Sequence, residues 1–212
     1  MQVMISPRFL TAWIAASGFA GNLSAAPAQP EVCTACLGPA AAPTGAVEGR
    51  ELSAIPDVWQ DDRGEPRKLS QLATRPQLLA MFYADCHMVC PMTVETLRTL
   101  ERELAAARID AGLVLVTLDP ATDSVAALAA FRREQKLSER WTLLRGTTLA
   151  TRRLAESLGI PFRLDAVRIA HGGMIVVTDA RGKIVAHFAG LHPDLAALRQ
   201  AVGVAATEAR PK

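Results

Sequence analysis

The sequence predicts an α/β protein in which a mixed β-sheet is flanked by helices. Short, continuously apolar runs at residues 77–83 and 112–118 are typical of buried central strands. Amphipathic helical stretches alternate with these runs along the chain. Near the C-terminus, two apolar segments are separated by Asp179-Ala180-Arg181-Gly182-Lys183, which indicates a β-hairpin.

The first 28 residues predict a secretory signal peptide or, if it is not cleaved, a membrane anchor. Arg8 precedes an uncharged stretch over residues 9–30 that is apolar early and rich in small residues late. Gly18, Gly21 and Asn22 dilute the hydrophobicity that a membrane span needs, so cleavage is favoured. Either way the globular part is expected outside the cytoplasm, in the periplasm, with membrane contact only through an uncleaved N-terminus.

Residues 29–54 predict a linker, because they are rich in Pro, Ala and Gly and show no helical or strand periodicity. This segment contains a first cysteine pair, Cys33-Thr34-Ala35-Cys36. The globular domain is predicted over residues 55–205.

The domain is expected to begin with a short strand at residues 55–59, a turn, and one helical turn at residues 69–72. The first central strand, residues 77–83, leads to an amphipathic helix from Pro91 to about Ala107. Apolar residues recur in that helix at steps of three and four: Val94, Leu97, Leu100 and Leu104.

The second central strand, residues 112–118, is followed by a helix at residues 125–134. A third helical stretch after residues 141–144 ends at Gly159. The strands of the hairpin, at residues 174–178 and 184–188, precede a closing helix from Pro193 to about Val202. This order of elements is the thioredoxin-like arrangement.

Composition narrows the functional classes. The chain has 212 residues, 50% hydrophobic and 21% charged, so it folds as an ordinary globular domain that needs no disulfide staples. Its 23 basic and 21 acidic residues are scattered, which argues against nucleic acid as a partner. Four cysteines are too few for a disulfide-dense scaffold and therefore require a chemical explanation.

The second cysteine pair, Cys86 and Cys90, lies between the first central strand and the helix that begins at Pro91. Helical N–H groups and the positive helix end face Cys90, so the pKa of its thiol is expected to fall from about 8.5 to about 3.5–7.5. A near-helical loop would put the two Cα atoms roughly 6 Å apart, which permits a disulfide. The same two sulfurs can also converge on one metal ion.

The motif Cys86-x-x-x-Cys90-Pro91 is followed by Thr-Leu-Asp-Pro-Ala-Thr-Asp at residues 117–123 and by Ala-His-Gly at residues 170–172. Together these segments resemble the Sco/SenC family of copper-binding, thioredoxin-like proteins. The resemblance implies a copper site formed by Cys86, Cys90 and His171, and a role in assembling the binuclear copper centre of respiratory cytochrome oxidase. It also implies a copper-receiving oxidase subunit as partner, with a copper donor chaperone or a thioredoxin-like reductant as further candidates.

The donor set suits copper on chemical grounds as well. Cu(I) favours thiolate, and imidazole is acceptable to both Cu(I) and Cu(II), so two sulfurs and one nitrogen can hold either state. His187, inside a predicted strand, and His192, at a helix start, are interpreted as structural.

The chain departs from the family pattern in two places. His87 and Met88 occupy the cysteine loop where family members usually carry Pro and Asp, and Gly172 stands where Ser is usual. An imidazole or thioether in the loop could add a copper ligand, or these side chains could simply pack or face solvent. Three acidic residues lie beside the motifs and could take part in acid–base chemistry or support the ligands: Asp85, Asp119 and Asp123. Structural roles in a strand-end turn and a helix cap are favoured, the cap for Asp123.

Three functional classes remain open. In a metallochaperone the ligands pass copper to a partner, whereas in a thiol:disulfide oxidoreductase Cys86 and Cys90 act on partner cysteines and need no histidine. A structural zinc module would use all four cysteines and is least favoured, because one pair lies in a linker. Cys33 and Cys36 could form an inert disulfide, a copper docking site or a redox partner for the second pair.

Overall fold

The computed structural model describes residues 47–86, 89–160, 162–164, 169–171 and 173–208. The predicted signal peptide and the linker as far as residue 46 lie outside the described residues. Among the described helices, none is long and apolar enough to cross a membrane.

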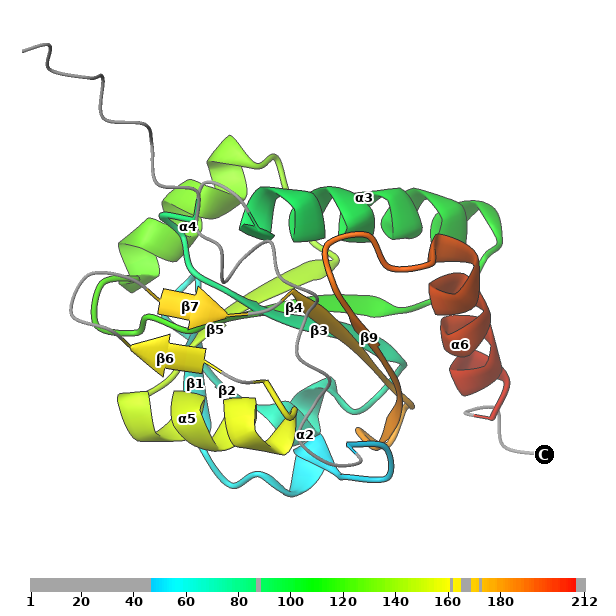
Figure 1. Ribbon diagram of the computed structural model, residues 1–212, viewed down its shortest axis with the longest axis horizontal. Helices are drawn as coiled ribbons and strands as arrows, with labels where there is room; N and C mark the ends of the chain where they lie inside the picture. The colour runs from blue at the N-terminus through cyan, green and yellow to red at the C-terminus, as the bar shows by residue number, and fades with distance from the viewer. Residues whose placement is uncertain (1–46, 87–88, 161, 165–168, 172, 209–212) are drawn as a thin grey trace, which may run out of the picture. The chain divides into compact units, whose positions relative to one another are not determined.

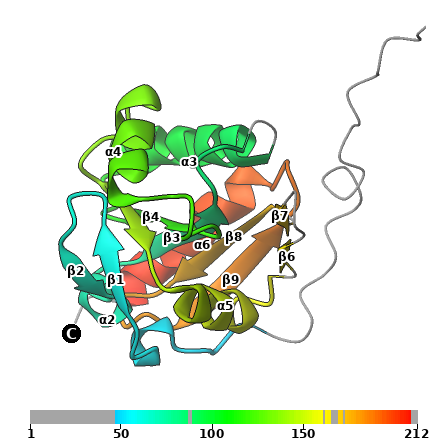
Figure 2. The same ribbon diagram turned by 90° about the vertical axis from the view of Figure 1, so that its left-hand side faces the viewer.

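The main sheet has seven strands in the order β2-β1-β5-β4-β3-β8-β9 (Figures 1 and 2). Its strands are β1 (Val58–Asp61), β2 (Pro66–Lys68), β3 (Gln77–Phe82), β4 (Gly112–Thr117), β5 (Trp141–Arg145), β8 (Met174–Thr178) and β9 (Ile184–Ala189). Strands β3, β4 and β5 are parallel, whereas β1 pairs antiparallel with β5 and β8 pairs antiparallel with β3. The predicted mixed, thioredoxin-like sheet is therefore confirmed.

Helices cover both faces of this sheet (Figures 1 and 2). They are α2 (Leu69–Leu72), α3 (Val89–Ala106), α4 (Val125–Glu134), α5 (Thr148–Ser157) and α6 (Leu195–Glu208), with a 3-10 turn at Leu52–Ala54. Side chains of α3, α4 and α6 share one hydrophobic cluster, and those of α2 and α5 share the other. A separate two-stranded sheet pairs β6 (Phe162–Leu164) with β7 (Ile169–His171).

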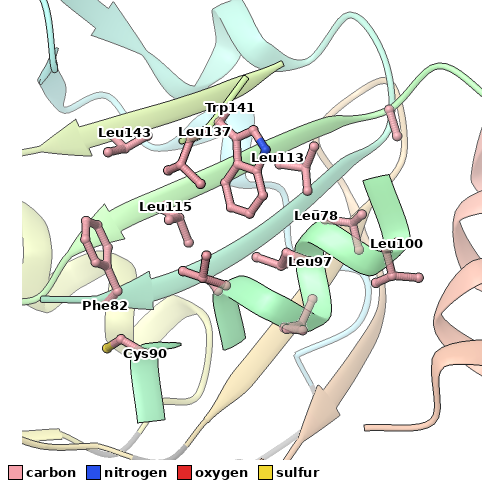
Figure 3. Packing of buried hydrophobic residues seen from close by; sticks show 14 of the residues in the cluster. Leu78, Phe82, Cys90, Leu97, Leu100, Leu113, Leu115, Leu137, Trp141 and Leu143 are labelled. Atoms are coloured by element: carbon pink, nitrogen blue, oxygen red, sulfur yellow. The ribbon is translucent and has the colours of Figure 1, made fainter. Parts of the chain in front are cut away.

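The continuous apolar run of β3 is explained by this layering. Leu78, Ala80 and Phe82 face the cluster under α3, and Leu79 and Met81 face the cluster under α5. Because successive strand residues point to opposite faces, a strand covered on both faces has no side chain directed at solvent, and residues 78–82 are all apolar. Figure 3 shows the first cluster, with Cys90 at its margin near Phe82.

Several boundaries differ from those predicted. Trp141–Arg145 forms the strand β5, where no element is predicted. The helix expected from Pro91 begins at Val89, so Cys90 belongs to its first turn. The closing helix begins at Leu195 and continues to Glu208.

Residues 47–54, which we call the N-terminal strap, pack against the domain, whereas their composition predicts a linker. Val47 is fully buried, and the N–H of Gly49 donates to the carbonyl oxygen of Ile184 at 2.8 Å. The Arg50 guanidinium donates to the last carbonyls of α5, those of Glu156 and Ser157, at 3.0 and 2.9 Å. Such backbone and single-residue contacts produce no sequence periodicity, so composition alone does not detect them.

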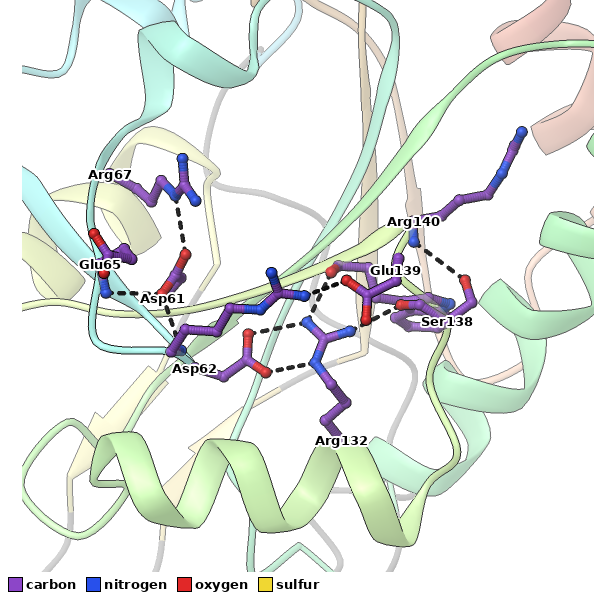
Figure 4. A network of polar contacts seen from close by, with 10 residues as sticks. Asp61, Asp62, Glu65, Arg67, Arg132, Ser138, Glu139 and Arg140 are labelled. Atoms are coloured by element: carbon purple, nitrogen blue, oxygen red, sulfur yellow. Dashed lines mark hydrogen bonds and ion pairs between the residues drawn. The ribbon is translucent and has the colours of Figure 1, made fainter.

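A polar network joins β1 and its turn to α4 (Figure 4). Arg132 forms a bidentate ion pair with Asp62, in which Nη2 lies 2.9 Å from Oδ1, and both side chains are largely buried. The same guanidinium donates to the carbonyl oxygen of Trp141 at 2.8 Å. The hydrogen bonds to Asp62, aided by its charge, raise the pKa of Arg132, so its guanidinium keeps its charge.

Candidate metal centre

The two cysteines lie where the central strand β3 passes into α3. The chain turns directly after β3, because the N–H of Cys86 donates to the carbonyl oxygen of Tyr83 at 3.2 Å. Helix α3 then begins at Val89, one residue before Cys90. Both sulfurs are therefore held at the end of a buried strand and the start of a long helix.

A hydrogen bond links the two cysteines directly. The backbone N–H of Cys90 donates to Sγ of Cys86 at 3.3 Å. Cys86 is 9% exposed and Cys90 is 1% exposed. The first turn of α3 thus directs an N–H group at the sulfur of Cys86, which stabilises negative charge on that atom.

The pKa of the Cys90 thiol is raised well above its ordinary value, which corrects the expectation of a lowered pKa. Hydrogen bonding with the Cys86 side chain is the largest cause, followed by burial and by the negative charge of Cys86. Two sulfurs this close cannot both carry charge at low cost without a cation between them. The structure therefore makes Cys86 the better supported thiolate and Cys90 the proton-retaining partner.

His171 is the last residue of β7, and its backbone pairs with Phe162 of β6. Strand β8 begins three residues later at Met174, since 174 − 171 = 3, and runs antiparallel to β3, with Ile175 opposite Ala80. The start of β8 and the end of β3 therefore lie at the same end of the sheet, which we call the cysteine end. Topology brings the backbone of His171 toward that end, while its role as a ligand remains a prediction.

Other sequence-predicted candidates fall outside the described residues: Cys33, Cys36, His87, Met88 and Gly172. The described residues alone contain no cluster of three or more His, Cys, Asp or Glu side chains that could hold a metal ion. His187 is adjacent to the Glu48 carboxylate in the N-terminal strap, with which it forms a close contact.

Asp123 holds the loop that carries Cys86. Its Oδ2 atom accepts the N–H of Ala84 at 3.0 Å and also accepts the Thr117 hydroxyl. Burial is the largest influence on the Asp123 carboxyl and raises its pKa, against the lowering effect of these two hydrogen bonds. The expected helix-cap role is wrong, because Ser124 caps α4 by accepting the N–H of Ala127 at 3.2 Å.

Arg145 holds the turn after β4 that carries Asp123. Its guanidinium donates to the carbonyl oxygens of Asp123 and Pro120 at 3.0 and 2.7 Å. Sequence reasoning missed this residue and the role of Thr117. Thr117, near the end of the otherwise aliphatic run 112–118, was the one local indication of this role in the sequence. A fully buried threonine hydroxyl requires a polar partner.

The remaining acidic candidates have ordinary positions. Asp119 shapes the turn after β4: its N–H donates to Oγ1 of Thr117 at 2.9 Å, and its Oδ1 accepts the N–H of Thr122 at 3.3 Å. Asp85 is exposed in the loop before Cys86. Asp119 therefore has the turn role expected from the sequence.

Comparisons with known proteins agree with this architecture. A protein of Stutzerimonas stutzeri named "Putative copper-binding protein" is 28% identical over 142 residues, covering 63% of this chain and 68% of its own length. The structure of Arabidopsis thaliana ScoI with copper bound superposes with a TM-score of 0.65 at 17% identity, covering 77% of this chain and 99% of that one.

A SCO1/SenC family lipoprotein from Bacillus anthracis also gives a TM-score of 0.65, at 18% identity, and covers 70% of this chain and 92% of its own. At these identities the solved structures show a common fold. The family model described as SCO1/SenC matches residues 58–205, which include the cysteine motif, the Asp119–Asp123 turn and the segment around His171. This chain therefore belongs to the SCO1/SenC family.

Proposed function

We propose that this protein binds copper through Cys86, Cys90 and His171 and delivers it during assembly of the binuclear copper centre of a respiratory cytochrome oxidase. The observation that carries the proposal is the hydrogen bond from the Cys90 N–H to Sγ of Cys86, at 3.3 Å. It supports a thiolate beside a second sulfur, and Cu(I) favours a pair of thiolates. Family membership and the copper-bound ScoI structure support the same metal.

Proton retention by Cys90 fits reversible copper binding. Without metal, the hydrogen bond with Cys86, burial and the charge of Cys86 raise the pKa of Cys90 and keep it protonated, whereas a bound cation would offset these effects. Binding would therefore release a proton, and copper would leave as the proton returns. A site used for transfer benefits from such a stable metal-free form.

Copper titration tests the proposed site. Under reducing conditions we expect one Cu(I) per chain at Cys86 and Cys90, and the variant Cys86→Ser/Cys90→Ser should lose this equivalent. The matched control, Cys33→Ser/Cys36→Ser, removes the same number of sulfurs and should retain it. Loss of binding in the control alone would contradict the assignment.

Delivery is tested separately. We expect the copper-loaded protein to form the binuclear centre in the copper-free soluble domain of a cytochrome oxidase subunit, followed by the absorption spectrum of that domain. If the subunit stays copper-free while this protein keeps its copper, the delivery role is wrong.

A thiol:disulfide oxidoreductase acting on partner cysteines is the alternative. Cys86 and Cys90 are close enough for a hydrogen bond, so a disulfide between them requires little movement. We place both activities in the periplasm, in line with the predicted signal peptide and the lipoprotein relative from Bacillus anthracis. Rapid reduction of partner disulfides by His171→Ala, without copper, would favour the alternative.

A further inference from the structure

A pocket with a volume of about 430 Å³, which we call the β5 pocket, opens where β5 ends. Strands β3, β4 and β5 are parallel, so their ends share the cysteine end of the sheet. Two strand spacings, or about 10 Å, separate the end of β5 from the end of β3. The lining residues come from β1, the turn after β4, the end of β5 and the start of α5, and include Val58, Gln60, Pro120, Ala121, Arg145 and Thr148.

The turn after β4 connects the β5 pocket to the cysteine loop. Pro120 and Ala121 of this turn line the pocket. Asp123, in the same turn, accepts the N–H of Ala84, two residues before Cys86. A molecule bound in the β5 pocket would therefore contact the turn that holds the cysteine loop.

Arg145 brings a positive charge into the β5 pocket, and within the described part of the chain it forms no ion pair. Its guanidinium donates to the carbonyl oxygens of Asp123 and Pro120 and, at 2.9 Å, to Oε1 of Gln60. These three acceptors are uncharged. A guanidinium carries five N–H groups, so two remain without an acceptor among the described residues. The pocket thus contains a cation that can donate to a further acceptor.

The rim of the β5 pocket adds a second cation and apolar surface. Arg152 is exposed and lies one helical turn after Thr148 on the same face of α5, whose first turn contains no acidic residue. Val58 and Leu149 are 54% and 58% exposed, and they are two of the three large hydrophobic side chains exposed in the described part of the chain. This combination favours a ligand that carries negative charge beside apolar side chains.

We propose that the β5 pocket docks an acidic segment of the copper-receiving protein. An Asp or Glu carboxylate of that segment accepts hydrogen bonds from Arg145, and a neighbouring apolar side chain packs on Val58. Hydrogen bonds between a guanidinium and a carboxylate are strengthened by charge, which favours this occupant over a neutral one.

Docking in the β5 pocket brings the partner close to the copper site. An extended segment of about three residues spans the 10 Å between the ends of β5 and β3, so the residues next to the docked carboxylate reach the cysteine loop. That the partner receives copper rests on the proposed function, whereas the acidic and apolar character of its segment follows from the pocket.

Peptide titration tests the chemistry of the occupant. The isotope-labelled, copper-free protein is titrated with acetyl-Leu-Asp-Leu-amide and, as the matched probe without charge, with acetyl-Leu-Asn-Leu-amide. We expect saturable NMR shift changes at the amides of Gln60, Ala121 and Gly146, and at least tenfold weaker binding of the Asn peptide. No saturable change, or equal affinity for the two peptides, would overturn the proposal. Inorganic phosphate that binds as tightly as the Asp peptide would make this a general anion site and also overturn it.

Charge reversal tests docking of the partner. Val58→Asp/Arg152→Glu places negative charge at the β5 pocket and leaves Arg145 in place, because Arg145 also holds the turn after β4. With the copper-free soluble domain of a cytochrome oxidase subunit as acceptor at limiting concentration, we expect copper transfer to slow at least tenfold. The matched control Val204→Asp/Arg199→Glu makes the same changes at exposed positions of α6, at the opposite edge of the sheet, and should transfer copper at the wild-type rate. Equal rates in the two variants would overturn docking at this pocket.

Copper stoichiometry separates docking from damage to the site. Both double variants should still bind one Cu(I) per chain. If Val58→Asp prevents folding, Arg152→Glu compared with Arg199→Glu gives the same test with charge alone. A dimer that Val58→Asp/Arg152→Glu abolishes and the control retains would assign the pocket to a second copy of this chain and overturn the proposal.

The two proposals fail in different ways. If the wild type binds the Asp peptide but never delivers copper, the proposed function is wrong and the acidic character of the occupant stands. If the wild type delivers copper and the pocket variant delivers it equally fast, the proposed function stands and docking at the β5 pocket is wrong.

Discussion

The backbone N–H of Cys90 lies 3.3 Å from Sγ of Cys86 and donates a hydrogen bond to it. The backbone at the start of α3 thus stabilises Sγ of Cys86, which precedes the helix. The thiol of Cys90, inside the helix, is buried and retains its proton. Two cysteines four residues apart therefore have different chemical roles, set by one backbone group and by burial.

Cu(II) binding should depend on His171. Imidazole is a better ligand for Cu(II) than for Cu(I), so His171→Ala should weaken Cu(II) binding at least tenfold and leave one Cu(I) per chain. Copper titrations followed by absorption spectra measure both states. The control His192→Ala removes an exposed imidazole and should change neither affinity. Undiminished Cu(II) affinity in His171→Ala would remove that residue from the site.

Stability of the reduced protein should fall at alkaline pH. The pKa of Cys90 is raised in the folded state, so its stabilising effect is complete below the unfolded thiol pKa of about 8.5 and is lost as the pH rises above it. One such thiol changes the free energy of unfolding by about 1.4 kcal/mol per pH unit.

Urea unfolding at pH 7 to 10 under reducing conditions measures this slope. Cys90→Ala should show a smaller slope than the wild type, because it removes the thiol whose pKa differs between the two states. Identical slopes in both proteins would contradict the assignment.

Asp123→Ala should destabilise the domain by about 2–4 kcal/mol, because it leaves the half-buried N–H of Ala84 and the buried Thr117 hydroxyl without their acceptor. Asp123→Asn keeps one carbonyl oxygen in place and should cost less than half as much. Chemical unfolding measures both values. Equal losses would show that the charge of Asp123, and not its accepting oxygen, holds the loop.

The polar network of Figure 4 contains a buried and an exposed ion pair that can be compared. Asp62→Ala leaves the largely buried Arg132 without its counter-charge and should cost about 3 kcal/mol. Glu139→Ala breaks the exposed pair with Arg63, whose side chains are 60% and 81% exposed, and should cost less than about 1 kcal/mol. Thermal or urea unfolding checks the order, and the reverse order would contradict the burial argument.

Local sequence patterns determined much of the fold. The apolar runs at residues 77–83 and 112–118 correspond to β3 and β4, and the helix predicted at residues 125–134 has those bounds in the structure. The hairpin of β8 and β9 follows its turn residues: Asp179 Oδ1 accepts the N–H groups of Arg181 and Lys183 at 2.8 and 2.9 Å. Periodicity, turns and caps act within a few residues, so one segment is enough to indicate them.

Tertiary structure decided what depends on distant neighbours. Trp141–Arg145 is a strand because β4 and β1 pair with its two edges, and the N-terminal strap is ordered because β9 accepts it. Asp123 meets Ala84 across 39 positions of sequence. The pKa of Cys90 is raised because its hydrogen bond with Cys86 and its burial outweigh the lowering effect of a backbone hydrogen bond with Tyr83. Desolvation and hydrogen bonding of Cys90 depend on residues brought together by the fold. The cysteine motif at the end of β3 therefore determines them only in part.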